Sequence, residues 1–196
     1  GTSTRGESGA ASADACLFDD YKFTVTTTDN TTSFSFDISA AGTFDVDCGD
    51  GATERYQTIE KPDTSDQIIT CNWPTADEHT VRIGGRATGY HVPSDDDYYC
   101  GYYACKNGTP YPAISFLWYN NVASISGSLG AIFPTINNGN GVLSQPSFVE
   151  TFMYNENLSG SIPSTLFDGI YGQPIAYMFR ATFADCYNLS GSIPAN

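Results

Sequence analysis

The sequence predicts a mostly β chain in which an antiparallel sandwich precedes a short repeat solenoid. One observation is a series of short runs between residues 21 and 90, in which apolar and polar residues alternate and glycine-rich turns separate the runs. The other is a repeat, because residues 151–163 recur as residues 182–194, an offset of 31. Self-similarity at a period of about 20–50 residues is typical of solenoids, whose units bury their apolar faces against their neighbours.

Composition and charge limit the classes of function. The chain has 196 residues, of which 40% are hydrophobic and 14% aromatic, so it can form one or two packed domains. Its net charge of −14 repels phosphate backbones and anionic lipids, so nucleic acid and membrane-surface partners are not expected. A membrane span is not expected either, because no apolar run approaches the ~18 residues that one needs.

Residues 1–16 are predicted to be a flexible N-terminal segment. Residues 1–15 are mostly Gly, Ser, Ala and Thr with scattered charges, and they lack the apolar stretch of a signal peptide. The absence of a signal peptide is explained equally well by its earlier cleavage, which leaves a mature N-terminus, and by trimming of the chain.

The cysteines indicate disulfides and an extracellular or cell-surface location. There are six cysteines, no Cys-x-x-Cys pair and only two histidines, both far in sequence from paired thiols, so a zinc site is not expected. Disulfides persist in oxidising compartments. Candidate glycosylation sites are Asn30 and Asn107, whereas the sequons at Asn157 and Asn188 fall inside the repeat, where a structural role is expected.

Residues 17–90 are predicted to form the sandwich. In residues 43–48, for example, Phe44, Val46 and Cys48 alternate with polar residues. Turn signals separate such runs at the spacing of an antiparallel sandwich. The alternating runs are residues 21–26, 33–38, 43–48, 67–73 and 79–83.

A Gly-Asp-Gly turn at residues 49–51 follows one of these runs. With residues 70–73 and 78–83, it resembles the Ig-like domains of the polycystic-kidney-disease (PKD) type. The resemblance implies an Ig-like sandwich that serves as an extracellular binding or spacer module without catalytic activity. Cys48 and Cys71 stand where that family has Trp and His on neighbouring core strands, which suggests a Cys48–Cys71 disulfide.

Residues 91–111 are predicted to be a Cys- and Tyr-rich loop between the two modules. Cys100 and Cys105 could close a small ring, and a bond from Cys16 to one of them is the alternative, since six cysteines allow fifteen pairings. Four tyrosines are candidates for a platform that binds sugars or protein partners, and the alternative is that their rings pack on the chain itself. These tyrosines are Tyr98, Tyr99, Tyr102 and Tyr103.

Calcium is the only cofactor for which the sequence offers candidate ligands. The candidate ligands are three adjacent carboxylates. Runs of charged residues are more often solvated, so we expect that the chain has no cofactor. The acidic residues around the Gly-Asp-Gly turn do not match an EF-hand, because Gly49 takes a ligand position, and a structural turn is expected there. The candidate ligands are Asp95, Asp96 and Asp97, and the residues around the turn are Asp45, Asp47, Asp50 and Glu54.

Residues 112–196 are predicted to form the solenoid, with an incomplete last unit. The shared Asn-Leu-Ser-Gly-Ser-Ile-Pro core resembles leucine-rich repeats of the kind found in bacterial surface proteins. The period of 31–33 exceeds their usual ~20–29 residues, so a standard horseshoe curvature is not expected. Glycine permits backbone conformations that a Cβ forbids, and proline ends strand pairing. The structural residues of the repeat are Gly127, Gly160, Gly191, Pro163 and Pro194.

The final unit stops at Asn196, where the preceding unit continues with Leu-Phe. An uncapped solenoid end exposes its core, so we expect that the protein continues or that another chain covers this end.

We expect a non-catalytic extracellular or cell-surface protein for adhesion or recognition. No Ser-His-Asp or Cys-His arrangement, Gly-x-Gly-x-x-Gly or P-loop occurs, so an enzyme is not expected. The expected partners are proteins or glycans at a cell surface, or copies of the chain itself. One alternative is a structural subunit that polymerises into a surface fibre through its open repeat end. The other is a carbohydrate-binding accessory module of a larger secreted enzyme.

Overall fold

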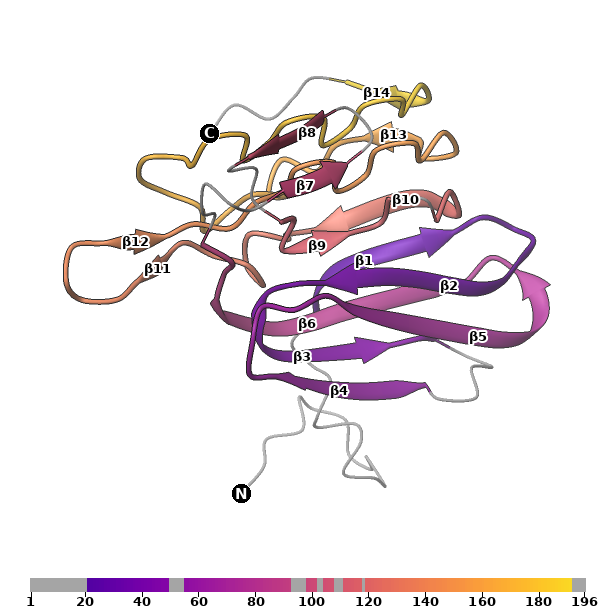
Figure 1. The fold of residues 1–196 in the computed structure, drawn as a ribbon. Coiled ribbons are helices and arrows are strands. Elements are labelled where there is room, and N and C mark those ends of the chain that lie inside the picture. The colour runs from indigo at the N-terminus through magenta and orange to yellow at the C-terminus, as the bar shows by residue number, and fades with distance from the viewer. Residues whose placement is uncertain are drawn as a thin grey trace.

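The computed structural model describes residues 21–49, 55–92, 98–101, 104–107, 111–117 and 119–191. All regular structure in these residues is β, and nearly all of it is paired antiparallel, so the prediction of a mostly β chain with an antiparallel sandwich is confirmed. One sheet has the strand order β10-β1-β6-β3-β4 and the other the order β5-β2-β9, and the two sheets pack face to face (Figure 1). Their strands are β1 (Tyr21–Thr27), β2 (Thr31–Ile38), β3 (Ala41–Asp47), β4 (Tyr56–Lys61), β5 (Gln67–Asp77), β6 (Thr80–Gly89), β9 (Ile114–Ser115) and β10 (Val122–Gly127).

Alternation along each strand separates core side chains from outward ones. On β2, Phe34, Phe36 and Ile38 are buried, whereas the residues between them are partly exposed. Successive side chains of a strand point to opposite faces, so this pattern directs every second residue between the two sheets. The core of the sandwich is formed in this way by apolar residues from both sheets.

The segment after residue 111 shares the sheets and the core of the sandwich. Strand β10 extends the five-stranded sheet by pairing with β1, with Val25 opposite Ile125, and β9 pairs with β2. The ring of Phe23 on β1 lies 6.1 Å from the ring of Phe116. The two predicted modules therefore pack around one continuous hydrophobic core, which the sequence did not indicate.

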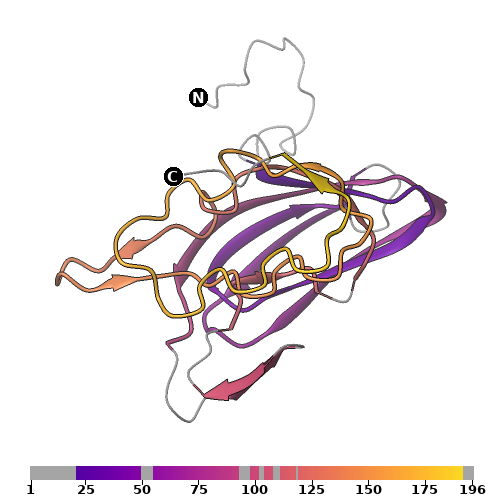
Figure 2. The same ribbon diagram turned by 90° about the horizontal axis from the view of Figure 1, so that it is seen from above.

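From residue 113 onward the chain winds through three coils, which we call coil 1 (residues 113–135), coil 2 (147–171) and coil 3 (178–191). Coil 1 includes β9 and β10 of the sandwich sheets. They lie one above another in Figure 1 and superpose when seen from above in Figure 2. Most coil residues are in turns, but β13 (Gly160–Ser161) and β14 (Leu189–Ser190) form a short parallel pair. A hairpin of β11 (Ile136–Asn137) and β12 (Leu143–Ser144) projects between coils 1 and 2.

Backbone hydrogen bonds and stacked rings join successive coils. The amides of Phe148 and Phe152 in coil 2 donate to the carbonyls of Met178 and Thr182 in coil 3, at 2.7 and 2.8 Å. The Phe152 ring stacks on Phe116 of coil 1 at 5.1 Å and on Phe183 of coil 3 at 5.2 Å, with interplanar angles of 9° and 3°. This spacing is close to the ~4.8 Å between paired strands, so rings at one repeat position stack along the coil axis.

The backbone conformation repeats together with the sequence. The three repeat glycines have left-handed φ values of 87°, 83° and 83°. At Gly127 a Cβ would also lie 2.2 Å from the carbonyl oxygen of Lys22, so both the conformation and the space there require glycine. Pro163 lies outside the paired strands, and Pro194 lies outside the described residues. The three glycines are Gly127, Gly160 and Gly191.

Asn155 and Cys186 occupy one position in successive repeats and make equivalent contacts. The Nδ2 of Asn155 donates to the carbonyl of Phe116 at 3.0 Å, and the Sγ of Cys186 donates to the carbonyl of Phe152 at 3.0 Å. Burial raises the pKa of the Cys186 thiol to about 11, so the thiol remains protonated at neutral pH and can donate. Each side chain therefore links its coil to the preceding one.

The disulfide that the sequence suggests between Cys48 and Cys71 is present and buried. Cys48 follows β3 and Cys71 lies on β5, so the bond joins the two sheets. We expect the double variant Cys48→Ala/Cys71→Ala to lose about 3 kcal/mol of unfolding free energy, because the bond closes a loop with a separation of 23 residues. Guanidinium denaturation measures this difference. A loss below about 0.5 kcal/mol would mean that the sheets hold together without the bond.

A second prediction concerns the Asn155 and Cys186 position. Cys186→Asn should change the unfolding free energy by less than about 1 kcal/mol, because Asn155 shows that the position accommodates an asparagine. Asn155→Ala removes two hydrogen bonds of a fully buried side chain and should cost about 2 kcal/mol. Urea denaturation of the two variants makes the comparison, and equal losses would contradict the equivalence of the two positions.

Candidate functional site

Two of the tyrosines that the sequence indicated for binding, Tyr98 and Tyr99, belong to a small hairpin. Its strands are β7 (Tyr98–Gly101) and β8 (Ala104–Asn107), and their register places Cys100 opposite Cys105. The backbone of Tyr98, Tyr99 and Asn107 belongs to these strands, but their side chains lie outside the described part of the chain. Tyr102, Tyr103, Asp95, Asp96, Asp97 and Cys16 also lie outside the described residues, whereas Asn30 is exposed in the turn between β1 and β2.

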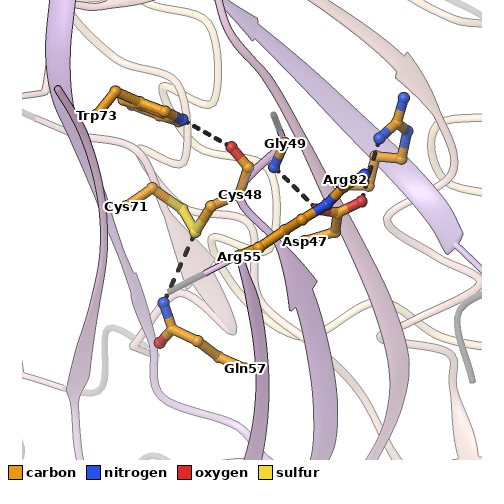
Figure 3. Close-up of polar contacts among 8 residues, drawn as sticks. All are labelled: Asp47, Cys48, Gly49, Arg55, Gln57, Cys71, Trp73 and Arg82. Atoms are coloured by element: carbon orange, nitrogen blue, oxygen red, sulfur yellow. Dashed lines mark hydrogen bonds and ion pairs between the residues drawn. A yellow bond between two sulfur atoms is a disulfide. The ribbon is translucent and has the colours of Figure 1, made fainter. Parts of the chain in front are cut away.

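The acidic residues before the Gly-Asp-Gly turn serve the fold. The Asp47 carboxylate is buried and accepts a hydrogen bond of 2.9 Å from the amide of Gly49 (Figure 3). The guanidinium groups of Arg55 and Arg82 approach it at 3.4 and 3.2 Å. The Asp45 carboxylate accepts from the hydroxyl of Thr58. Among the described residues, no three His, Cys, Asp or Glu side chains gather into a group that could hold a metal ion.

The disulfide end of the sandwich is closed by polar contacts. The indole Nε1 of Trp73 donates to the carbonyl of Cys48 at 2.9 Å, and the indole ring stacks on the His79 ring at 4.0 Å. Gln57 donates to Sγ of Cys48 (Figure 3). It also donates to the carbonyl of Thr70. A polar pocket of about 260 Å³ beside this region is lined by Arg55, His79 and Arg82 among others.

An apolar groove lies on the side of the coil stack away from the sandwich, and we call it the end groove. Its volume is about 630 Å³. Phe167, Ile170 and Tyr171 of coil 2 form one wall, and the other is formed by coil 3. The residues of coil 3 in that wall include Met178, Phe179, Thr182 and Phe183.

Aromatic rings give the end groove its shape. The Phe179 ring stacks on Phe148 at 5.9 Å and meets the Phe167 ring nearly edge to face at 4.8 Å. Tyr171 is 53% exposed and Phe179 is 43% exposed. An apolar groove with exposed rings is the candidate site for a ligand or another protein.

The sequence did not identify Phe167 and Ile170 as part of a binding surface. They line a groove because the described part of coil 3 ends at Gly191, before the repeat positions 31 residues after them. The signal that could have located the groove is the offset of 31, which places Phe179 and Phe183 at the same repeat positions as the buried Phe148 and Phe152.

None of the described residues forms a helix that is long and apolar enough to cross a membrane. Comparison of the chain with protein-family models, with curated proteins and with solved structures gave no significant match. The resemblances to PKD-type domains and to leucine-rich repeats therefore stay predictions.

Proposed function

We propose that the chain is a non-catalytic extracellular or cell-surface protein that uses the end groove for recognition or adhesion. The end groove carries this proposal, because it is a cavity of about 630 Å³ that is lined mainly by apolar and aromatic side chains. Such rings provide large contact area at a low cost in conformational entropy, as binding surfaces require. None of the described residues that line it carries a charge, so catalysis by a general acid or base has no support from this part of the chain.

The finer part of the proposal is that residues 112–196 are leucine-rich-repeat-like units stacked on an Ig-like sandwich. Two observations support it: the hydrogen bonds between coils recur at the repeat offset, and Asn155 and Cys186 alternate at one position. Asparagine and cysteine exchange in this way in leucine-rich repeats. The buried Cys48–Cys71 disulfide supports an oxidising, extracellular compartment.

Adhesion of coated beads tests this function. Beads that carry the chain should be retained on immobilised fibronectin or mucin more strongly than on albumin, since both are components of extracellular surfaces. The double variant Tyr171→Asp/Phe179→Asp places two charges in the end groove and should lower retention by ~10-fold, because burying an unpaired charge is costly. Protease treatment of the surface should abolish binding to a protein, and periodate treatment should abolish binding to a glycan.

Val142→Asp is the matched control, because Val142 is 63% exposed and lies outside the end groove. Its beads should be retained like those that carry the unaltered chain. Retention equal to that on albumin, or retention that the double variant leaves unchanged, would contradict the proposed function.

A further inference from the structure

The outer side of coil 3 carries a polar pattern in addition to its apolar groove. Around the positions of Phe148 and Phe152, amides of one coil donate to carbonyls of the next coil along the chain. Elsewhere in the stack the direction reverses, since the amide of Ser159 in coil 2 donates to the carbonyl of Ala123 in coil 1. Ala113 and Phe116 of coil 1 donate to Ser147 and Thr151 of coil 2. Four amides of coil 2 donate in the same way to carbonyls of coil 3. The pairs of amide and carbonyl are Phe148 and Met178, Glu150 and Arg180, Phe152 and Thr182, and Tyr154 and Ala184.

Coil 3 presents the same donors at the same repeat positions. Phe179, Ala181 and Phe183 follow Phe148, Glu150 and Phe152 by 31 residues, and their amides make no hydrogen bond to any described residue. The backbone repeats as well, since Glu150 and Ala181 both have φ of 54°. We call the three amides of Phe179, Ala181 and Phe183 the donor row.

The carbonyl groups beside the donor row are already used. The carbonyl of each of these three residues accepts a hydrogen bond from the amide three residues later, in successive turns. The amide of Thr182 donates to Phe179, that of Ala184 to Ala181 and that of Cys186 to Phe183. The outer side of coil 3 is therefore rich in donors and poor in free acceptors. A partner that satisfies it must supply carbonyl groups about two residues apart.

We propose that the end groove and the donor row together bind a polypeptide coil of this same repeat type, with the carbonyl side of that coil facing the donor row. Such a coil would continue the interface that coil 3 makes with coil 2. Its rings would stack on Phe179 and Phe183, as Phe183 stacks on Phe152 at 5.2 Å. The proposal rests on the proposed function, and it specifies the chemical class of the partner.

The described coils of a second copy do not fit this role. Coil 2 already occupies the carbonyl side of coil 3. The sandwich occupies carbonyls of coil 1, because the amide of Ser39 donates to the carbonyl of Ala113 and the amide of Ala87 donates to the carbonyl of Ile132. Two copies that met through their end grooves would place one donor row against the other. The partner is therefore a coil whose carbonyl side is free.

Binding of a synthetic peptide with the sequence of residues 161–191 tests the proposal. The fluorescein-labelled peptide is titrated with the full chain and followed by fluorescence anisotropy. We expect saturable binding that unlabelled peptide reverses and that a scrambled peptide does not show. Phe179→Asp should weaken the binding by ~10-fold or more, because Phe179 lines the groove beside the donor row. Val142→Asp should bind like the unaltered chain, and near-ultraviolet circular dichroism checks that both variants fold.

Equal binding of the repeat and scrambled peptides, or binding that Phe179→Asp leaves unchanged, would overturn the proposal. A dimer in sedimentation velocity that Phe179→Asp dissociates would also overturn it, because the occupant would then be a second copy. If the peptide fails while chain-coated beads are still retained through the end groove, only this inference fails and the proposed function stands.

A second measurement does not depend on the affinity of a free peptide. In the extended chain a copy of residues 166–191 follows Asn196. This copy continues the repeat in register, because its first residue comes three residues after Pro194, just as Leu166 comes three residues after Pro163. The extended chain should unfold at a higher temperature than a chain extended with a scrambled sequence. Equal unfolding temperatures would contradict the proposal.

Discussion

The stack of phenylalanine rings that runs from the sandwich into the coils is the interaction on which the rest of the structure depends. Phe23 of β1 lies beside both Phe116 and Phe152, and Phe152 stacks in turn on Phe183. The coils contain little regular strand pairing of their own, so each buries its apolar side against its neighbours. The first coil finds this support in the sandwich, which thus acts as the base of the stack.

Around the positions of Phe148 and Phe152 the stack is directional, because the backbone hydrogen bonds between coils run one way there. At these positions amides face away from the sandwich and carbonyls face toward it, whereas Ser159 of coil 2 donates back to Ala123 of coil 1. An exposed row of unpaired backbone groups is a template for association, and proteins usually cover it or use it. The end groove adds an apolar surface to that row. One side of the molecule thus combines hydrogen-bond donors with exposed rings, whereas the opposite side of the coils is closed by the sandwich.

The strands of the sandwich could be predicted wherever apolar and polar residues alternate strictly, as on β2. Strand β4 was missed because only Ile59 and Lys61 along it are buried, so its pattern is weak. The repeat glycines could be recognised from sequence, since their left-handed backbone recurs with the motif. The place of β10 in the sandwich sheet could not, because its residues resemble the repeat and its pairing with β1 joins segments far apart in the chain.

The candidate site was beyond sequence reasoning for a related reason. The repeat offset places Phe179 at the position of the buried Phe148, but the groove between Phe179 and Phe167 arises only where two coils meet. Asp47 illustrates the converse, because a carboxylate beside a glycine-rich turn could serve a metal or the fold. Its burial between two arginines and the amide of Gly49 assigns it to the fold.

Amide hydrogen exchange measured by NMR is the most direct test of a directional coil stack built on the sandwich. The amides of Phe148, Glu150 and Phe152 donate between coils, so they should exchange far more slowly than those of Phe179, Ala181 and Phe183 at the same repeat positions. Protection of the first three comparable to that of the sandwich strands would confirm one cooperative core. Equal, rapid exchange of both sets would contradict the stacked arrangement from which the groove and its proposed function are derived.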